Sequence, residues 1–278
     1  MVRRLTGACV AAWTALLVAG PPNPSITARA QTRQRTLDCP APGPPPARLP
    51  APAQEKLARS FQAARRHARH VWRDTPPVNA DGTVNVFVEI APGTDEKWEF
   101  DMAANRRELD RRIPATLDGY PVGYGFVPRT VNVDGDPFDG LVLGEDVEAG
   151  AIVRGHVLGL MHMTDEKGSD EKVIVTAEPR EDVRRTLLDD RMRERIATFF
   201  NRYKAEDEDA ETFACVSGWS DADAGRRFVE AASRLFVKGR AGRGPHGQLG
   251  SPADAPRRRP AAATASSTAL FPAFARHT

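Results

Sequence analysis

Three carboxylates are crowded into one short segment, because residues 134–140 read Asp-Gly-Asp-Pro-Phe-Asp-Gly with no basic residue among them. Like charges held this close raise one another's pKa, and a bound divalent cation is the usual way to keep them all ionised. A ligand set made only of oxygen atoms favours magnesium, manganese or calcium over zinc. The segment therefore predicts a divalent metal site formed by Asp134, Asp136 and Asp139.

A calcium-binding EF-hand is the main alternative for this loop. EF-hand ligands stand at positions 1, 3, 5 and 12, with glycine at position 6. Asp134, Asp136 and Glu145 fit positions 1, 3 and 12, but Phe138 takes position 5 and Asp139 replaces the glycine. The flanking residues also predict strands rather than helices, so we exclude the EF-hand.

A second acidic segment reads Asp-Glu-Lys-Gly-Ser-Asp at residues 165–170, between two apolar stretches. Alone it is typical of an ordinary polar turn, but two acidic loops on one small barrel can direct carboxylates at the same ions. Lys97 with Glu99 and Asp170 with Lys172 each share a face of a predicted strand. Either pair alone is more typical of a structural ion pair that stabilises little when exposed.

Apolar periodicity predicts the elements that must position these loops. Helical spacing over residues 51–73 predicts an extra amphipathic helix, in which we expect His67 and His70 at the surface. Short strands are expected at 84–90, 97–100, 140–143, 151–163 and 172–176, followed by helices at 190–204 and 221–238. This order of elements predicts an α+β fold with helices packed on a small barrel.

The N-terminus has the layout of a secretory signal peptide over residues 1–30. Arg3 and Arg4 precede an uncharged run at 5–20, and Ala-Arg-Ala at 28–30 is a candidate cleavage site. The run is shorter than the ~20 apolar residues of a membrane span, so no stable membrane span is expected. The protein is then periplasmic or secreted; if these residues are instead a mistaken start or a disordered tail, it is cytoplasmic.

Both ends of the chain are basic and the middle is acidic. Residues 31–50 are proline-rich and predict a disordered linker, and residues 239–278 predict a disordered basic tail. Residues 1–50 and 239–278 each carry six arginines and one aspartate, against a net charge of +2 for the chain, so the middle carries −8. An acidic middle argues against a nucleic-acid surface and suits a protein that concentrates cations.

Two cysteines, Cys39 and Cys215, lie outside the predicted signal peptide, and they do not have the spacing of zinc ligands. They could pair in an oxidising compartment. The apolar neighbours of Cys215 favour a buried free thiol instead.

The acidic loop resembles the signature of the soluble family I inorganic pyrophosphatases. Tyr-Pro-Val-Gly-Tyr-Gly at 120–125 precedes it and Met-Thr-Asp-Glu at 163–166 follows it, in the order found in that family. The resemblance extends over residues 70–238 and implies an inorganic pyrophosphatase domain there. It implies a small OB-like five-stranded β-barrel with flanking α-helices, and a homo-oligomer that is typically a hexamer in bacteria.

The resemblance also implies a role for each candidate site residue. Asp136 matches the catalytic carboxylate that accepts the proton of the attacking water. The metal ligands implied are Asp134, Asp139, Asp165 and Asp170. The implied substrate-binding residues are Lys97, Arg111, Tyr124, Lys172, Tyr203 and Lys204, and the supporting residues are Glu89, Glu99, Tyr120 and Glu166. The implied cofactor is Mg²⁺, several ions per subunit, with Mn²⁺ as the alternative.

Together these residues predict hydrolysis of pyrophosphate to two orthophosphates by a magnesium-activated water. Metal ions lower the pKa of water from ~15.7 towards ~7 and neutralise phosphate oxygens, a carboxylate takes the proton, and basic side chains balance the leaving phosphate. Two other functions remain open at this point. One is an exported, non-catalytic binder of metal or polyanions, and the other is a hydrolase of another phosphoanhydride, although the sequence has no glycine-rich phosphate loop.

Overall fold

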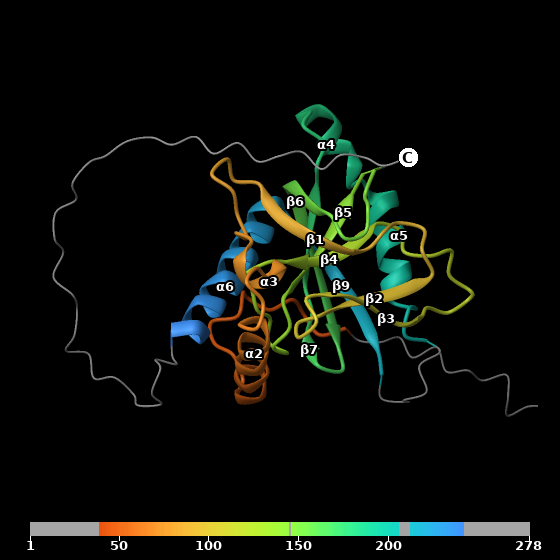
Figure 1. Cartoon of the computed structure of the whole chain (residues 1–278). Coiled ribbons are helices and arrows are strands. Elements are labelled where there is room, and N and C mark those ends of the chain that lie inside the picture. The colour runs from red at the N-terminus through yellow and green to blue at the C-terminus, as the bar shows by residue number, and fades with distance from the viewer. Residues whose placement is uncertain (1–38, 145, 206–211, 242–278) are drawn as a thin grey trace, which may run out of the picture. The chain divides into compact units, whose positions relative to one another are not determined.

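The structure is a computed structural model that describes residues 39–144, 146–205 and 212–241 (Figure 1). The predicted signal peptide, the first part of the predicted linker and almost all of the predicted basic tail lie outside the described residues. The described part of the linker, residues 39–50, contains no helix or strand.

Five strands close into a ring in which each is hydrogen-bonded to the next. The order is β1-β4-β5-β8-β6, and β6 pairs again with β1. Every pairing in the ring is antiparallel except that of β5 with β8. The ring strands are β1 (Val84–Ile90), β4 (Gly123–Val127), β5 (Phe138–Leu143), β6 (Ile152–Asp165) and β8 (Lys172–Thr176). The ring with its flanking helices agrees with the predicted OB-like α+β fold.

Four further strands extend this core. β7 (Gly168–Ser169) and β9 (Ala214–Ser220) both pair with β6, while β2 (Glu96–Asp101) and β3 (Arg106–Arg112) form a separate hairpin. The sequence did not reveal β3, because all of its residues except Leu109 are charged and the strand has no buried face. Pairing with β2, rather than hydrophobic alternation, defines it.

The helices surround the ring, and α5 and α6 lie on opposite sides of the strands in Figure 1. The predicted helix over residues 51–73 is shorter than expected: it ends at Ala64, and a turn separates it from a second, short helix. The helix α4 was not predicted because none of its residues is buried. The helices are α2 (Ala51–Ala64), α3 (Val71–Asp74), α4 (Glu181–Leu187), α5 (Asp190–Phe200) and α6 (Ala222–Ala241).

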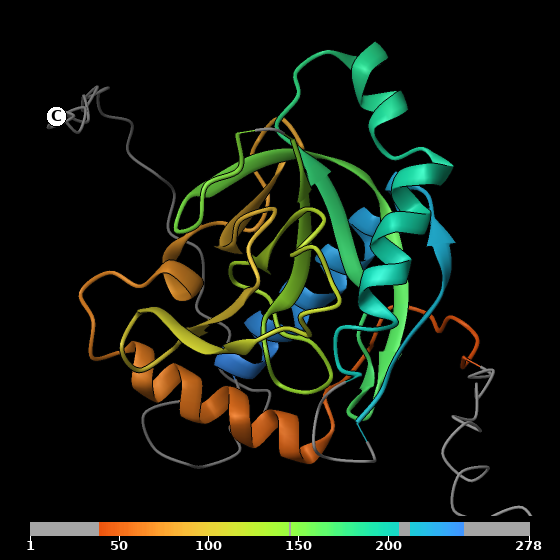
Figure 2. The same ribbon diagram turned by 90° about the vertical axis from the view of Figure 1, so that its right-hand side faces the viewer.

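The apolar core has three parts, one beside α5, one beneath α6 and one between α2 and α6. Figure 2 shows these helices around the ring of strands. α6 covers the ring with Phe228, Val229 and Ala232, and residues of α5 pack beside Tyr120. β1 and β8 are buried along their whole length, including the polar residues Asn85, Glu89 and Lys172. Burial on this scale holds the ends of the strands, and the loops that they carry, in fixed places.

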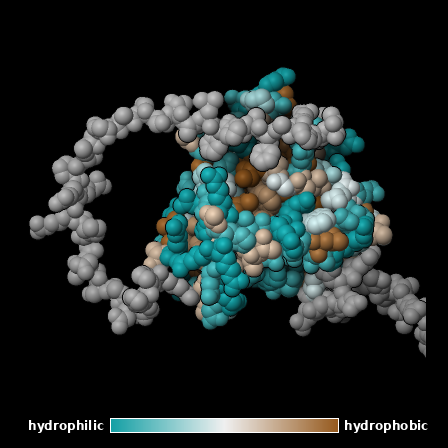
Figure 3. All heavy atoms as spheres, in the orientation of Figure 1, coloured by the Kyte–Doolittle hydropathy of each residue, from teal (hydrophilic) through white to brown (hydrophobic). Residues whose placement is uncertain are grey.

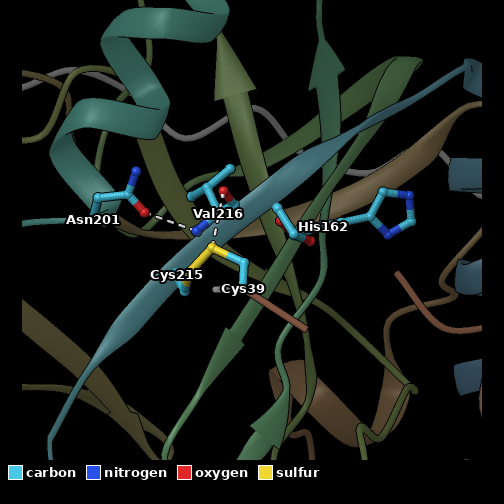
Figure 4. The surroundings of a disulfide bond; sticks show 6 residues. Cys39, His162, Asn201, Cys215 and Val216 are labelled. Atoms are coloured by element: carbon cyan, nitrogen blue, oxygen red, sulfur yellow. Dashed lines mark hydrogen bonds between the residues drawn. A yellow bond between two sulfur atoms is a disulfide. The ribbon is translucent and has the colours of Figure 1, made fainter. Parts of the chain in front are cut away.

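Cys39 and Cys215 form a disulfide, so the expectation of a buried free thiol is wrong. Their Cα atoms are 5.7 Å apart, within the usual range for a disulfide. Figure 4 shows the bond beside β9, where the backbone N–H of Val216 donates to Oδ1 of Asn201 at 2.7 Å. The disulfide therefore attaches the segment before α2 to the strand next to β6.

His70 is buried, contrary to the expectation that it lies at the surface. Only 2% of it is exposed, and its Nε2 lies 3.0 Å from the carbonyl oxygen of Met102. Its Nδ1 accepts a hydrogen bond from the backbone N–H of Arg73 and caps α3. Burial lowers the pKa of His70, and the carbonyl of Met102 offsets this only in part.

Hydrophilic residues cover much of the face shown in Figure 3, and the hydrophobic residues on it form small patches. Among the described residues, none of the helices combines the length and the apolar character needed to cross a membrane.

Candidate active site

One cavity brings together most of the side chains that the sequence singled out. Its walls come from β1, the β2–β3 hairpin, the loop before β5, the turn after β6 and the end of α5. These segments are far apart in sequence, so only the closed ring brings them together. The predicted residues that line the cavity are Glu89, Lys97, Glu99, Tyr120, Tyr124, Asp134, Asp136, Asp139, Asp165, Asp170, Tyr203 and Lys204.

The acidic loop before β5 is held by its own backbone. The N–H of Asn132 donates to the carbonyl oxygen of Asp136 at 2.7 Å, and the N–H of Asp136 donates to Oδ1 of Asp134 at 3.0 Å. Gly135 adopts a φ of 88°, which glycine reaches at little cost. Asp139 is already part of β5, opposite Phe126 of β4. The three carboxylates are therefore placed by a tight turn and the first residues of a strand.

Lys172 joins the two acidic segments from beneath the cavity. Its Nζ lies 2.6 Å from Oδ2 of Asp139 and 3.0 Å from Oδ2 of Asp170, and its side chain is only 1% exposed. The hydroxyl of Tyr124 donates to the same oxygen of Asp139 at 2.9 Å. Burial alone lowers the pKa of Lys172, but Asp139 and Asp170 outweigh it and raise that pKa. Lys172 therefore stays charged.

Two more lysines stand at the cavity with carboxylate partners. The Nζ of Lys204 lies 3.0 Å from Oδ2 of Asp165 and 2.8 Å from Oε2 of Glu166. The Nζ of Lys97 lies 2.5 Å from Oε1 of Glu99. Lys204 lies on the turn after α5 and Lys97 lies on β2, so the two ammonium groups reach the site from separate elements.

Burial and mutual repulsion raise the pKa of several of the carboxyl groups. The cavity walls partly desolvate Asp136 although 46% of its side chain is exposed; this desolvation, followed by the charge of Asp134, raises the pKa of Asp136 to about 6, and Lys56 opposes the shift. Burial raises the pKa of Asp170 well above its usual range; Lys172 opposes this and Asp139 adds to it. Burial and the charge of Asp139 do the same for Glu89. Seven carboxylates line the cavity against three lysines, so carboxylates outnumber ammonium groups there.

Three predicted residues do not line the cavity, and several that line it were not predicted. Lys172 lies beneath it, Glu166 is held outside by Lys204, and Arg111 stands next to Lys97 across the β2–β3 hairpin. The unpredicted lining residues are Phe100, Met102, Phe126, Asn132, Pro137, Lys167 and Phe200. Lys167 belongs to the acidic turn at 165–170, and this position is the sequence feature that could have identified it as a site residue.

A further residue contacts the site from outside the predicted domain. Lys56 of α2 places its Nζ 2.5 Å from Oδ2 of Asp136. Nothing in the sequence around Lys56 distinguishes it from the other charged residues of that helix.

The cavity fits a divalent cation in donor type and in charge. Its carboxylates supply only oxygen donors, which suit magnesium or manganese. The pKa values of Asp170 and Glu89 are raised mainly by burial, with a further contribution from the charge of Asp139, and a bound cation would favour the ionised form of both. Among the described residues, no three metal-binding side chains already form a compact ligand group. The carboxylates therefore fit a divalent cation, although several of them are paired with lysines in this structure.

A protein-family model matches the part of the chain that forms this site. The model of the inorganic pyrophosphatase family matches residues 86–236, which include the residues that line the cavity, both acidic loops and all of the ring except the first two residues of β1.

Similar proteins agree with that match. An inorganic pyrophosphatase of Saccharolobus solfataricus is 34% identical over 167 residues, which cover 57% of this chain and 95% of the relative. One of Halobacterium salinarum is 37% identical over 176 residues, covering 60% of this chain and 96% of the relative. The similarity thus spans nearly all of each relative and somewhat more than half of this chain.

Solved structures show the same correspondence. The inorganic pyrophosphatase of Thermus thermophilus aligns with a TM-score of 0.56 and 32% identity, covering 60% of this chain and 99% of that one. The one of Coxiella burnetii aligns with a TM-score of 0.53 and 34% identity, covering 58% and 99%.

Proposed function

This chain belongs to the inorganic pyrophosphatase family, an enzyme family that hydrolyses pyrophosphate, and we propose that it does so with magnesium as cofactor and Asp136 as general base. The observation that carries the proposal is the cavity itself, where two acidic loops face lysine and tyrosine side chains. Family membership favours an enzyme over a non-catalytic binder of metal or polyanions.

The proposed ligands of the cation are Asp134, Asp139, Asp165 and Asp170, which all line the cavity. The chemistry that bound magnesium supplies is a lower pKa of water and neutralisation of phosphate oxygens. Lys172 and Tyr124 orient Asp139 through its Oδ2 atom. Manganese is the alternative cofactor, because it accepts the same oxygen donors.

Asp136 takes the proton of the attacking water in the proposed reaction. Its side chain is 46% exposed, more than those of Asp139, Asp165 and Asp170, so water reaches it most easily. A new P–O bond forms as the bridging P–O bond breaks, and the proton passes to a carboxylate oxygen of Asp136.

The cationic side of the cavity holds the phosphates in this proposal. Lys97 and Lys204 line it directly, with Tyr203 beside Lys204 and Arg111 next to Lys97 on the hairpin. Their charges balance those that build up on the leaving phosphate, which is mainly an electrostatic contribution. Glu89, Glu99 and Glu166 support the site by holding backbone or lysine groups around it.

The test is release of orthophosphate from pyrophosphate by the purified chain with magnesium. We expect turnover that stops when a chelator removes the metal and returns when magnesium is restored. Tripolyphosphate and a nucleoside triphosphate in parallel decide between pyrophosphate and another phosphoanhydride as the preferred substrate. A folded, magnesium-saturated protein without turnover on any of the three would contradict the proposal.

We further propose that the chain assembles as a homo-oligomer, with a hexamer as the expected state by family resemblance. Sedimentation velocity of the purified protein, read against the mass of a single 30.3 kDa chain, measures this directly.

We also propose that the protein is exported. The disulfide between Cys39 and Cys215 supports export, because disulfides persist mainly outside the reducing cytosol. Mass spectrometry of the mature N-terminus tests the proposal: cleavage after Ala30 supports it, and an intact start in the cytoplasm contradicts it.

A further inference from the structure

Helix α2 forms part of the surroundings of the active site although it precedes the residues that match the family. The match begins at residue 86, and α2 ends at Ala64. A Cβ atom built on Gly135 would lie 2.9 Å from Cβ of Lys56 and 3.0 Å from the carbonyl oxygen of Ala53. The backbone of the helix therefore rests directly on the acidic loop, and glycine at 135 makes room for it.

The helix is fixed to the rest of the molecule by its apolar face. Ala53, Leu57 and Ala64 are buried, and Gly239 of α6 allows close approach of Leu57. The ring of Phe61 lies 5.0 Å from that of Trp72 and 4.9 Å from that of Phe236, between centroids. α2 is thus packed like a core element, and it holds Lys56 in place from a rigid base.

Lys56 gives Asp136 an ion pair from outside the family-matched region; Lys167, inside that region, also interacts with the charge of Asp136, but the two form no ion pair in the described part of the chain. In that region Lys172 pairs with Asp139 and Asp170, and Lys204 pairs with Asp165. Among the described residues, Lys56 is the only cation paired with Asp136, at 2.5 Å from its Oδ2.

We propose that Lys56 is a positioning residue of the active site. It is the counter-ion of Asp136 and orients that carboxylate, and it opposes binding of a divalent cation to the acidic loop. The second effect follows from charge, because an ammonium group at the loop repels a metal ion that approaches the same carboxylates. The inference rests on the proposed role of Asp136 as the base, and it adds a determinant from outside the family domain.

The test compares four full-length, disulfide-intact proteins: wild type, Lys56→Met, Lys56→Arg and Arg59→Met. Arg59 is the matched control, because it is an exposed cation on the same helix and pairs with no carboxylate in the part of the chain that the structure describes. Lys56→Arg keeps the charge on Asp136. Equal melting temperatures would show that α2 stays folded in all four.

Two measurements decide the outcome. In calorimetric titration with Mg²⁺ and no substrate, we expect Lys56→Met to bind magnesium roughly threefold or more tightly than wild type. In steady-state assays at saturating magnesium, we expect its kcat to fall roughly three- to tenfold with an unchanged KM for pyrophosphate. Lys56→Arg and Arg59→Met should resemble wild type in both.

The proposal is overturned if Lys56→Met and Arg59→Met bind magnesium equally. A rise in KM for pyrophosphate without a change in magnesium affinity also overturns it, since Lys56 would then contact substrate. Failure of the proposed function is seen separately, as a wild type that does not hydrolyse pyrophosphate, and the magnesium titration can be interpreted even then.

Discussion

The carboxylates of the active site are chemically alike but differ in environment. Asp139 and Asp170 share the buried ammonium group of Lys172, and Asp165 is held by Lys204. Asp136 is more open and is paired with Lys56, a half-exposed side chain. Asp136 therefore differs from the other three in exposure and in its lysine partner.

Asp136→Asn tests the role of the base. The amide keeps the shape of the side chain but cannot accept the proton, so we expect kcat to fall by roughly 10²- to 10⁴-fold. Asp190→Asn is the control, because the Asp190 side chain is fully exposed on α5, and we expect it to leave kcat unchanged. Near-wild-type kcat in a folded Asp136→Asn protein would assign the base to another group.

His70 makes stability depend on pH. Its pKa is lowered in the folded protein mainly by burial, so the folded state binds its proton less readily than the unfolded chain does. The contribution of neutral His70 is complete above the unfolded pKa of ~6.5 and is lost as the pH falls from there towards the lower folded pKa.

The measurement is the free energy of unfolding by urea between pH 7 and pH 5. We expect a steeper loss in wild type than in His70→Gln, by up to about 1.4 kcal/mol per pH unit. Gln62→Ala, at an exposed residue of α2 that does not titrate, is the control and should keep the wild-type slope. Parallel curves for wild type and His70→Gln would contradict the expectation.

At the scale of elements, the ring of strands depends on close backbone approach at β4. Gly125 pairs with Val88 of β1 and with Gly140 of β5. A Cβ atom at Gly125 would lie 1.9 Å from the carbonyl oxygen of Phe87, which is backbone and cannot move aside alone. Since Tyr124 precedes Gly125 and lines the cavity, a shift of β4 would also move the site.

Gly125→Ala should therefore destabilise the protein and reduce its activity together. We expect a loss of about 1–3 kcal/mol or more in the free energy of unfolding, because the added methyl group overpacks the strand pairing. Gly43→Ala is the matched control, since a Cβ atom at Gly43 would meet nothing within 4 Å, and it should change stability by less than ~0.5 kcal/mol. Equal stability of the two variants in urea would show that β4 adapts.

At the scale of the whole molecule, the segment before the family domain is attached at two places. The disulfide joins Cys39 to Cys215 on β9, across a sequence separation of 176 residues. Further along the chain, α2 packs against α6 and the acidic loop. The extension is thereby part of the folded unit, even though the family domain begins after it.

Removal of the disulfide should lower stability without removing the fold. A cross-link that closes so long a loop restricts the unfolded chain, and loss of a native disulfide typically costs about 2–5 kcal/mol. The double variant Cys39→Ser with Cys215→Ser, compared with wild type in urea under oxidising conditions, measures this. Reducing agent should lower the stability of wild type and leave that of the double variant unchanged.

The sequence predicted helices packed on a small barrel and most of the residues that line the cavity, but it did not reveal the ring strand β4. Asp134, Asp136 and Asp139 lie within one tight loop, so local spacing was enough to predict that they act together. Alternation over 84–90 and the apolar residues at 172–176 predicted β1 and β8, because the residue types of a strand indicate whether it is buried.

Only the tertiary structure decided the contacts that join distant segments. The charged strand β3, the disulfide of Cys215 and the burial of His70 have no local signal, because each depends on a partner elsewhere in the chain. The same holds for Lys56, which is one charged residue among several on α2 until the fold places it 2.5 Å from Asp136. Periodicity reports which face of an element is buried, whereas the identity of its neighbour is fixed only when the chain folds.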